Sequence, residues 1–440
     1  MKYHIITFGC QMNISDSERV ASVLESMKYK KTSNINEADL IVVAMCSVRQ
    51  TAVDRVHGLA PKFKKMNKIN KNLKTVLTGC VLKKDKRNLS KIFNYIIDIK
   101  DIQKISDFLE DKHGVKFRSS EILRQKDYLN IMPNYSSRFS ANIPIMTGCN
   151  NFCSYCVVPY SREKEISRPA EEIVCEIKNL VKNNYKEIWL LGQNVNSYKD
   201  CACQCDRTDN CKEINFPKLL KMINSIPGNF WIRFTSSHPK DFSDELVKTI
   251  AGCKKYKHYL NLPLQSGDNN ILRKMNRPYT AVQYKNLVKK IRKAMPDISL
   301  STDIIVGFPG ETKKHLENTV KLFRDIRFDM AYINKYSPRA GTSAAKLKDS
   351  VSPAEKKHRE KVLTEILKAT ALSHNKKLIG KKIIVLIDSK KNNIYFGKSE
   401  GYKTVKIAQE SRLKTNCLIG GFSRVKITNA NPWGLEGILI

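Results

Sequence analysis

The sequence lacks any long apolar run. No stretch reaches the ~18 residues that a membrane span requires, and residues 1–5 carry neither the apolar stretch nor the small-residue cleavage site of a secretion signal. These absences favour a soluble, cytoplasmic chain without a membrane partner. With 440 residues, the chain is long enough for two or three domains, each with its own core.

Acidic residues are few relative to basic ones. The chain has 42 Asp and Glu against 78 Lys and Arg, which gives a formal net charge of +36. Such a balance favours polyanionic partners, because neutralised phosphates release condensed counterions. The excess is largely lysine, and a compositional bias accounts for it equally well. Charge alone therefore does not establish RNA binding.

The thirteen cysteines are an odd number in a chain without a secretion signal. Disulfide bonds are disfavoured in that setting, so metal or redox chemistry is the better expectation.

Hydrophobic periodicity divides the chain into an α/β part and an all-β tail. Short apolar runs alternate with amphipathic helical patterns through residues 1–140, which predicts a doubly wound parallel sheet. Six further strand–helix repeats over 141–350 predict a partial (β/α)6 barrel, whose chemistry is expected at the carboxyl ends of its strands. A charged helix over 351–374 leads to a tail, 375–440, with five short strand patterns and Gly and Asn turns. This pattern predicts a small all-β barrel.

The predicted strands have the following bounds. In the first region they are Tyr3–Phe8, Leu40–Ala44 and Thr75–Leu77, with a helix over Ser15–Met27. In the second they are Ile143–Met146, Ile188–Leu191, Trp231–Thr235, Tyr259–Leu262, Leu300–Val306 and Met330–Lys335. In the tail they are Ile383–Ile387, Tyr395–Phe396, Thr404–Ile407, Ser423–Thr428 and Gly437–Ile440.

A cysteine motif follows the first predicted barrel strand. Cys149, Cys153 and Cys156 have the spacing Cys-x3-Cys-x2-Cys, which supplies three thiolates to a 4Fe–4S cluster and leaves one iron open. An open iron can chelate the amino and carboxylate groups of S-adenosylmethionine (SAM). Electron transfer then cleaves SAM to a carbon radical, with the protein providing the positioning. A structural zinc site is the alternative, but no fourth ligand lies nearby in the sequence.

Three polar residues near predicted strand ends are candidates for contacts with SAM. They are Gln193, Arg233 and Asp303, and each is equally compatible with a polar group of the barrel core. Asp303 opens a run that ends in Gly307-Phe308-Pro309-Gly310, where two glycines permit close backbone approach. This run resembles the adenine-contacting strand of radical SAM enzymes.

A second cysteine triad lies in the first region. Cys10, Cys46 and Cys80 each follow an apolar strand pattern and are separated by about one βα unit. Neighbouring strand ends of a parallel sheet meet at one edge, so three distant thiols are expected to form one site with a second cluster. A lone cysteine is often only a small buried hydrophobe, but three at consecutive strand ends favour ligation.

Together these motifs resemble the methylthiotransferase family of radical SAM enzymes over essentially the whole chain. The run Gly9-Cys10-Gln11-Met12-Asn13 is similar to the branch that acts on isopentenylated adenosine in tRNA, as is Cys156-Val157-Val158-Pro159-Tyr160. Leu262-Pro263-Leu264-Gln265-Ser266-Gly267 and Ser337-Pro338-Arg339-Ala340-Gly341-Thr342 also match family signatures.

The resemblance implies two 4Fe–4S clusters, SAM, a reducing donor such as flavodoxin or ferredoxin, and a C-terminal TRAM barrel. One SAM methylates sulfur on the second cluster and another supplies the radical. The methylthio group then goes to C2 of N6-isopentenyladenosine beside the anticodon, at position 37 of tRNA. Such a loop base can be splayed from its stack. Expected phosphate contacts in the tail are Lys398, Lys403, Lys406 and Arg424.

Four residues depart from the family pattern. Ala44-Met45 precede Cys46 where the family commonly has Asn-Thr, Gln50 stands where Glu is common, and Glu163 stands where an Arg-Gly pair usually continues from Arg162. Two other substrates stay open, namely threonylcarbamoyl-adenosine in tRNA and a ribosomal protein. A non-catalytic, cluster-bearing RNA-binding protein is an alternative from a different class.

A further cysteine group, Cys201, Cys203, Cys205 and Cys211, does not belong to the family pattern. Four thiols can bind one zinc ion, but a variable surface loop without a role is the favoured interpretation.

Overall fold

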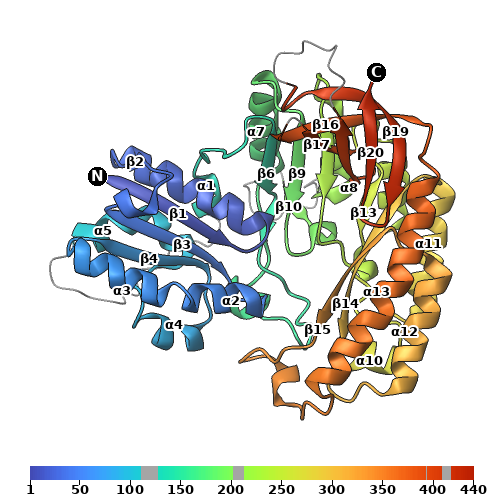
Figure 1. Ribbon diagram of the computed structural model, residues 1–440, viewed down its shortest axis with the longest axis horizontal. Helices are drawn as coiled ribbons and strands as arrows, with labels where there is room; N and C mark the ends of the chain where they lie inside the picture. The colour runs from blue at the N-terminus through green and yellow to red at the C-terminus, as the bar shows by residue number, and fades with distance from the viewer. Residues whose placement is uncertain (111–126, 202–212, 393, 409–417) are drawn as a thin grey trace.

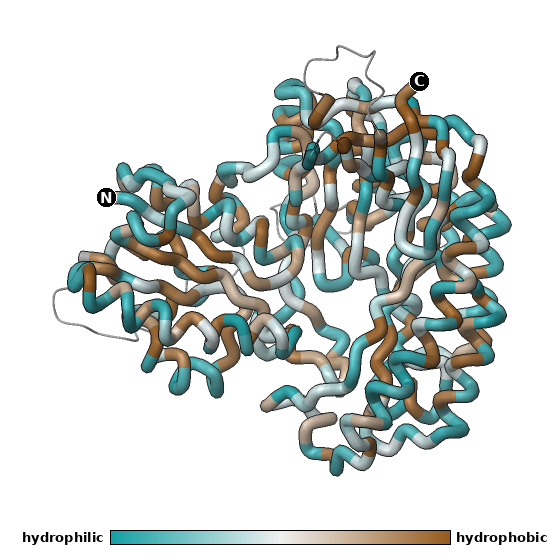
Figure 2. Tube along the Cα trace, in the orientation of Figure 1, coloured by the Kyte–Doolittle hydropathy of each residue, from teal (hydrophilic) through white to brown (hydrophobic). Residues whose placement is uncertain are grey.

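The computed structural model describes residues 1–110, 127–201, 213–392, 394–408 and 418–440. Figure 1 shows the N-terminal part of the chain as a layered body beside the packed central and C-terminal parts. In Figure 2, hydrophobic colouring runs along the inner strands and hydrophilic colouring dominates the outer helices.

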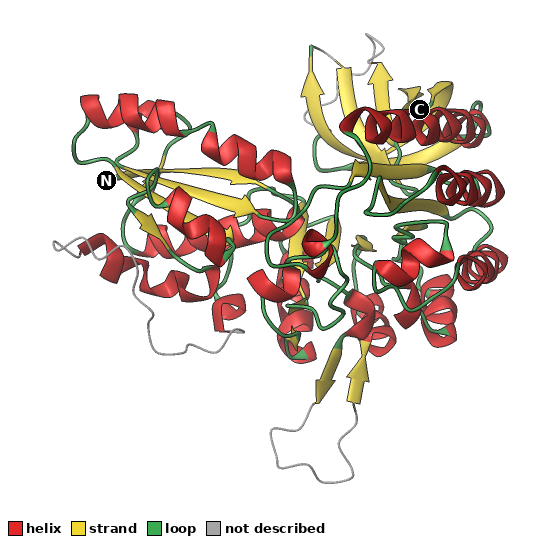
Figure 3. Ribbon diagram, turned by 90° about the horizontal axis from the view of Figure 1, so that it is seen from below, coloured by secondary structure: helices red, strands yellow, loops and turns green. Residues whose placement is uncertain are grey.

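The N-terminal part is built on an all-parallel sheet of order β2-β1-β3-β4-β5. Alternate residues of its central strand, such as Val42 and Val43, belong to two separate apolar cores, so both faces are covered by helices (Figure 3). The predicted parallel sheet is confirmed. The strands are β1 (Lys2–Phe8), β2 (Lys30–Lys31), β3 (Leu40–Cys46), β4 (Lys74–Cys80) and β5 (Tyr95–Ile96). The helices are α1 (Gln11–Ser26), α2 (Gln50–His57), α3 (Ala60–Ile69), α4 (Lys83–Leu89) and α5 (Ile105–Glu110).

Helix α1 begins four residues earlier than its apolar periodicity predicts. Cys10 is the N-cap, and its backbone N–H donates to Oδ1 of Asn13 at 3.3 Å. Asn13 thus takes the place of the glutamate of a capping box. Cysteine is not a typical N-cap residue, which is why the sequence pattern did not reveal this start.

The central part contains six parallel strands in two sheets, of order β12-β9-β6 and β13-β14-β15. A parallel bridge between Ile232 and Tyr256 connects the two sheets, and a single apolar core runs beneath both. The strands are β6 (Ser140–Pro144), β9 (Glu187–Leu191), β12 (Trp231–Phe234), β13 (Tyr259–Asn261), β14 (Ser299–Val306) and β15 (Met330–Lys335). The helices are α6 (Val158–Ser161), α7 (Ala170–Lys182), α8 (Phe216–Ser225), α9 (Asp244–Gly252), α10 (Asn269–Lys274), α11 (Ala281–Ala294) and α12 (Lys313–Ile326).

Helix α13 (Pro353–Lys376), capped by Ser352, leads to a closed five-stranded barrel of order β16-β17-β18-β20-β19. Alternate strand residues fill its interior, as the period-2 pattern of the tail predicts. The predicted five-stranded barrel is confirmed. Its strands are β16 (Lys382–Lys391), β17 (Ile394–Ser399), β18 (Thr404–Ala408), β19 (Phe422–Asn431) and β20 (Gly434–Leu439).

The three parts of the chain meet in one aromatic cluster. The ring of Tyr402, between β17 and β18, lies 4.9 Å from Trp189 of β9 and 4.7 Å from Tyr259 of β13. Met12 of α1 belongs to the same apolar cluster. The C-terminal barrel is therefore an integral part of the central core.

Candidate functional site

The loop with Cys149, Cys153 and Cys156 leaves the central part after the short strand β7 (Met146–Thr147). Gly148 begins it with a φ of 79°, and a Cβ there would lie 2.0 Å from the carbonyl oxygen of Lys164. Only glycine fits such a position. The N–H of Cys149 donates to the carbonyl of Glu163 at 3.2 Å, which ties the two ends of the loop together.

The three cysteines of this loop are half-buried. Burial raises the pKa of Cys156 to about 12 and also raises that of Cys149. The sulfur of Cys149 accepts a hydrogen bond from Asn151 at 3.4 Å, and that of Cys153 accepts one from Arg277 at 3.5 Å. Metal binding at such thiols must release their protons, because the thiolate is the ligand.

Cys10, Cys46 and Cys80 lie at the carboxyl ends of β1, β3 and β4, where Cys46 is paired directly with Cys80 across the sheet. A hydrogen bond from the Cys46 thiol lowers the pKa of Cys10 to about 6. The pKa of Cys46 is raised by that hydrogen bond, by burial and by the charge of Cys80. The structure thus brings the three thiols of the triad together.

Neither triad has the arrangement of a site for a single metal ion. Among the described residues, no three His, Cys, Asp or Glu side chains converge closely enough to bind a single metal ion. In a 4Fe–4S cluster each thiolate binds a different iron, so its ligands stand farther apart than those of one ion. The donor set of three thiolates at each triad fits such a group.

Unpartnered polar atoms line the carboxyl ends of β9 and β12. Gln193 Oε1 is buried without a hydrogen-bond partner among the described residues, as is the amide of Asn196. Ser237 Oγ and His238 Nε2, just after β12, are in the same state, and burial lowers the pKa of His238 to about 2. Gln193 was predicted because it is a polar residue just after a strand. The same rule applies to Asn196, Ser237 and His238 and would have predicted them too.

Asp303 lies on β14, half-buried, and accepts a hydrogen bond from Asn261 at 3.1 Å. Burial raises its pKa, while the charges of Arg49 and Arg277 oppose that rise. Since Arg49 precedes α2, Asp303 lies where the N-terminal and central parts face each other.

The side chain of Arg233, a candidate SAM contact in the sequence, is bonded to protein groups instead. Its guanidinium donates to the Glu187 carboxylate at 2.7 Å and to the carbonyl oxygens of Ser399 and Glu400, both at 2.8 Å. The side chain is fully buried and stacks against Trp189, Trp231 and Tyr402. The structure therefore places Arg233 at the contact with the C-terminal barrel.

We expect Arg233→Met to lower the free energy of unfolding by about 3–5 kcal/mol, because it strands the buried Glu187 carboxylate. Urea unfolding followed by tryptophan fluorescence measures this, since Trp189 and Trp231 flank the guanidinium. The double variant Arg233→Met/Glu187→Gln removes the stranded charge and should regain part of the loss. A single variant as stable as the parent would contradict this account.

The glycine turn after β14 is held by a buried ion pair. The N–H of Gly307 donates to the Glu311 carboxylate at 2.5 Å, and Arg359 of α13 pairs with that carboxylate at 2.7 Å. Gly307 has a φ of 69°, consistent with the turn that its sequence predicts. This arrangement fixes the turn beside the cysteine loop.

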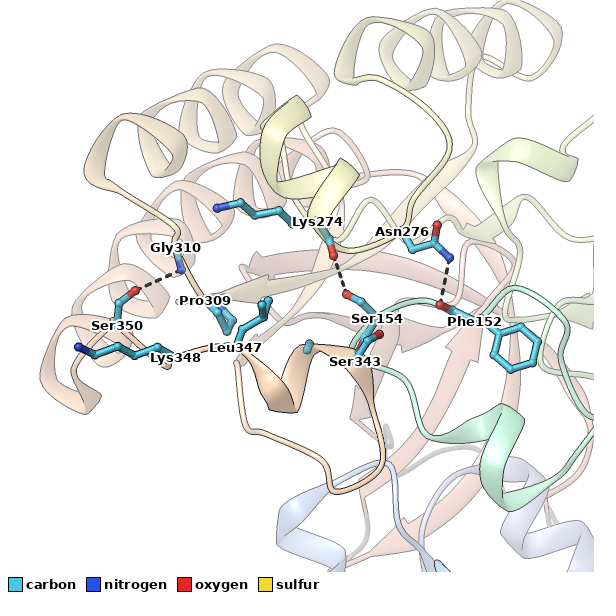
Figure 4. A pocket seen from close by; sticks show the side chains of 11 residues that line it. Phe152, Ser154, Lys274, Asn276, Pro309, Gly310, Ser343, Leu347, Lys348 and Ser350 are labelled. Atoms are coloured by element: carbon cyan, nitrogen blue, oxygen red, sulfur yellow. Dashed lines mark hydrogen bonds between the residues drawn. The ribbon is translucent and has the colours of Figure 1, made fainter.

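A cavity of about 660 Å³ lies between this turn and the cysteine loop (Figure 4). Phe152 and Ser154, which flank Cys153, line one side, and Ser154 Oγ donates to the carbonyl of Lys274 at 2.8 Å. Gly310 and Ser350, hydrogen-bonded at 3.2 Å, line the opposite side.

The departures from the family pattern have local explanations. Glu163 has a φ of 60°, the left-handed region that glycine adopts without strain, and its carboxylate pairs with Lys100 at 2.8 Å. Gln50 accepts a hydrogen bond from Arg339 of the central part. The carbonyl of Met45 accepts from Asn13 at 3.1 Å, an interaction that needs no particular side chain at position 45.

The four expected phosphate contacts fall into two groups. Lys403 is paired with Asp329 at 2.7 Å, and Lys398 donates to Thr404 at 2.7 Å beneath the Tyr402 ring, so both serve internal contacts. Lys406 and Arg424 are exposed on the barrel surface.

Of the remaining group of four cysteines, only Cys201 lies among the described residues, at the end of a strand. Strand β10 (Lys199–Cys201) pairs with β11 (Glu213–Asn215), while Cys203, Cys205 and Cys211 lie outside the described residues. The expectation of a loop without a role stays a prediction. In the described part of the chain, no helix has both the length and the apolarity needed to cross a membrane.

Comparison with known families gives two matches along the chain. Residues 143–323 match the radical SAM superfamily, and residues 2–99 match a family described as uncharacterized protein family UPF0004. The first match contains the cysteine loop and the second contains Cys10, Cys46 and Cys80.

Solved structures share the fold at low sequence identity. A radical SAM methyltransferase, TsrM from Kitasatospora setae, solved with cobalamin and a [4Fe–4S] cluster bound, aligns with a TM-score of 0.56 at 12% identity, covering 78% of this chain and 74% of that one. The cobalamin-dependent SAM radical enzyme OxsB aligns with a TM-score of 0.52 at 12% identity, covering 85% of this chain and 56% of that one.

Curated relatives match over the full length. A tRNA-2-methylthio-N(6)-dimethylallyladenosine synthase of Clostridium novyi (strain NT) is 39% identical, over 100% of this chain and 96% of the relative. The protein of the same name in Caldicellulosiruptor saccharolyticus is 40% identical, over 100% of this chain and 92% of the relative. With both cysteine triads inside these matches, the chain belongs to the tRNA-2-methylthio-N(6)-dimethylallyladenosine synthase family of radical SAM enzymes.

Proposed function

We propose that the chain is a tRNA methylthiotransferase that adds a methylthio group to C2 of N6-isopentenyladenosine at position 37, beside the anticodon. One observation carries the proposal: the segment that follows one cysteine triad contacts a cysteine of the other. The sulfur of Cys80 is within 2.9 Å of Nε of Arg162, and Arg162 follows the last cysteine of the other triad by six residues. This contact supports an arrangement in which radical formation at one triad and sulfur delivery from the other act on the same substrate atom.

The residues assigned to the two clusters follow from this arrangement. Cys149, Cys153 and Cys156 hold the 4Fe–4S cluster that binds SAM, and Cys10, Cys46 and Cys80 hold a second 4Fe–4S cluster. When bound, the first cluster and SAM supply a carbon radical able to remove hydrogen from the unactivated C2 carbon. A side-chain base cannot do this, so the protein's part is to bind, orient and exclude water.

We place SAM at the carboxyl ends of β9, β12 and β14. The unpartnered atoms of Gln193, Asn196, Ser237 and His238 fit the amino, carboxylate and ribose groups of SAM, because each is buried and lacks a hydrogen bond in the described chain. We assign Asp303 as a polar group of this interior. Arg233 is not among the proposed SAM contacts, because its donors bind Glu187 and the carbonyls at 399–400.

We divide the chain into four units: a doubly wound N-terminal domain over 1–140, a partial (β/α)6 radical SAM barrel over 141–350, a linker helix over 351–374, and a TRAM-like barrel over 375–440. The last is proposed to bind tRNA. The enzyme acts in the cytoplasm and takes electrons from a flavodoxin or ferredoxin.

The direct test is an anaerobic assay of the reconstituted protein with SAM, a chemical reductant and tRNA. Mass spectrometry of the nucleosides should show a methylthio adduct on tRNA with N6-isopentenyladenosine. The same tRNA with plain adenosine, and tRNA with threonylcarbamoyl-adenosine, are the controls and should give none. Product only on the threonylcarbamoyl substrate would overturn the proposed specificity, and no 5′-deoxyadenosine with any substrate would favour a non-catalytic protein.

The tail offers a separate test of RNA binding. We expect Lys406→Gln/Arg424→Gln to weaken tRNA binding and to flatten the dependence of log K on log salt by roughly 1.5, the value for two lost phosphate contacts. Filter binding at several salt concentrations measures the slope. Lys289→Gln/Lys293→Gln, with the same charge change on exposed residues of helix α11, is the control. Equal slopes for the two double variants would show that the barrel surface does not contact phosphates.

A further inference from the structure

Arg162 is a buried side chain that crosses from the cysteine loop into the N-terminal part. Only 5% of it is exposed. Its Nε donates to the sulfur of Cys80 at 2.9 Å, and a terminal nitrogen donates to the hydroxyl of Tyr128 at 3.1 Å. The other terminal nitrogen pairs with the carboxylate of Asp16, which is also fully buried.

These partners span both cysteine sites. Cys80 ends β4, and Asp16 lies on α1, which Cys10 caps. On the other side, the residue after Arg162 offers its carbonyl to the N–H of Cys149 at 3.2 Å. A path of two hydrogen bonds, the Arg162 side chain and the backbone from Arg162 to the Glu163 carbonyl therefore joins a cysteine of one triad to a cysteine of the other.

We propose that Arg162 is a positioning residue that fixes the Cys10–Cys46–Cys80 site against the loop of the SAM-binding cluster, and that its N–H on the Cys80 sulfur makes the cluster bound there easier to reduce. This inference rests on the proposed assignment of a second cluster to those cysteines. Hydrogen bonds to ligand sulfurs and nearby positive charge stabilise the reduced, more negative state of a cluster. The fork of an arginine is suited to this role, because three of its donors point to three partners in fixed directions.

A purely structural ion pair would also bury an arginine, and Arg168 provides that comparison within the same chain. It is 5% exposed and pairs with Glu176 at 2.7 Å, and its other side-chain partners among the described residues are the carboxylate of Glu172 and the carbonyl of Pro144. No thiol is among them. A change at Arg168 therefore reports on the loss of a buried ion pair alone.

The test measures the reduction potential of the second cluster in a chain that lacks the first. In the background Cys149→Ala/Cys153→Ala/Cys156→Ala, only iron held by Cys10, Cys46 and Cys80 gives a signal in a redox titration followed by electron paramagnetic resonance. Arg162→Gln keeps hydrogen-bond donors but removes the charge. We expect it to make reduction about tenfold less favourable, about 59 mV for one electron. Arg162→Lys keeps the charge but removes the Nε donor to the Cys80 sulfur, so it should shift the potential in the same direction by less, and it serves if the Gln variant does not fold.

The positioning role has its own readout in the chain with both clusters. For Arg162→Lys we expect the yield of methylthio product per 5′-deoxyadenosine to fall about tenfold, since a misplaced second cluster wastes radicals. Arg168→Lys should keep both the potential and this ratio.

Three results would overturn the inference. An unchanged potential with a loaded second cluster removes the role of Arg162 and leaves the proposed function intact. An equal shift in Arg168→Lys shows a general effect of destabilisation. A background protein without bound iron overturns the proposed function and this inference together.

Discussion

Replacing Cys149, Cys153 and Cys156 together by alanine is expected to abolish cleavage of SAM to 5′-deoxyadenosine. The three thiols supply all protein ligands of the proposed SAM-binding cluster, and no side chain can replace an iron that accepts SAM and passes it an electron. The loop itself should persist, because its ends are fixed by Gly148 and by the hydrogen bond from the backbone of Cys149 to Glu163, which alanine retains.

The variant should still bind about four irons at the other triad, because those cysteines belong to a different sheet with its own apolar cores. Iron analysis and chromatographic quantification of 5′-deoxyadenosine measure both results. Cys175→Ala/Cys253→Ala is the control, since these thiols lie outside both triads. Residual 5′-deoxyadenosine in the triple variant would refute the assignment of this cluster.

Replacing Cys10, Cys46 and Cys80 by alanine should give the opposite pattern: continued cleavage of SAM, and no methylthio product. The second cluster is the proposed source of sulfur, so its loss leaves radicals without a group to deliver. We also expect this variant to lose some stability. Arg162 loses its contact with the Cys80 sulfur, and an unpaired buried donor costs about 1–3 kcal/mol.

For this reason the rate of SAM cleavage is best compared per loaded SAM-binding cluster, with thermal unfolding recorded alongside. Nucleoside mass spectrometry measures the methylthio product against the parent protein. Any product from a variant shown by iron analysis to lack the second cluster would mean that the sulfur comes from elsewhere.

The parts of the fold that the sequence predicted are those with strong local patterns. The all-apolar run of β3 and the alternation in the tail predicted a buried parallel strand and a five-stranded barrel. The meeting of Cys10, Cys46 and Cys80 followed from one rule about strand ends. No comparable rule found the start of α1, because a cysteine and an asparagine cap it in place of the usual residues.

The side chains that differ from expectation have partners distant in sequence. Arg233 stood beside a strand end, as a ligand contact would, but Glu187 and the backbone at 399–400 satisfy it. Lys403 is likewise paired with Asp329, 74 residues away. Pairing over such separations leaves no periodic signal, so only the folded arrangement distinguishes these residues from surface or ligand contacts.

The seating of Tyr402 against Trp189 and Tyr259 has a consequence for how the chain is made. A ribosome releases the N-terminal residues first, and domains generally fold in that order. Here the central core stays incomplete until the segment around Tyr402 has been made. Until then the guanidinium of Arg233 lacks the carbonyls of Ser399 and Glu400. A nascent chain halted before this segment would leave the rings of Trp189 and Tyr259 without the Tyr402 ring that covers them. Exposed apolar surface of this kind is what chaperones bind.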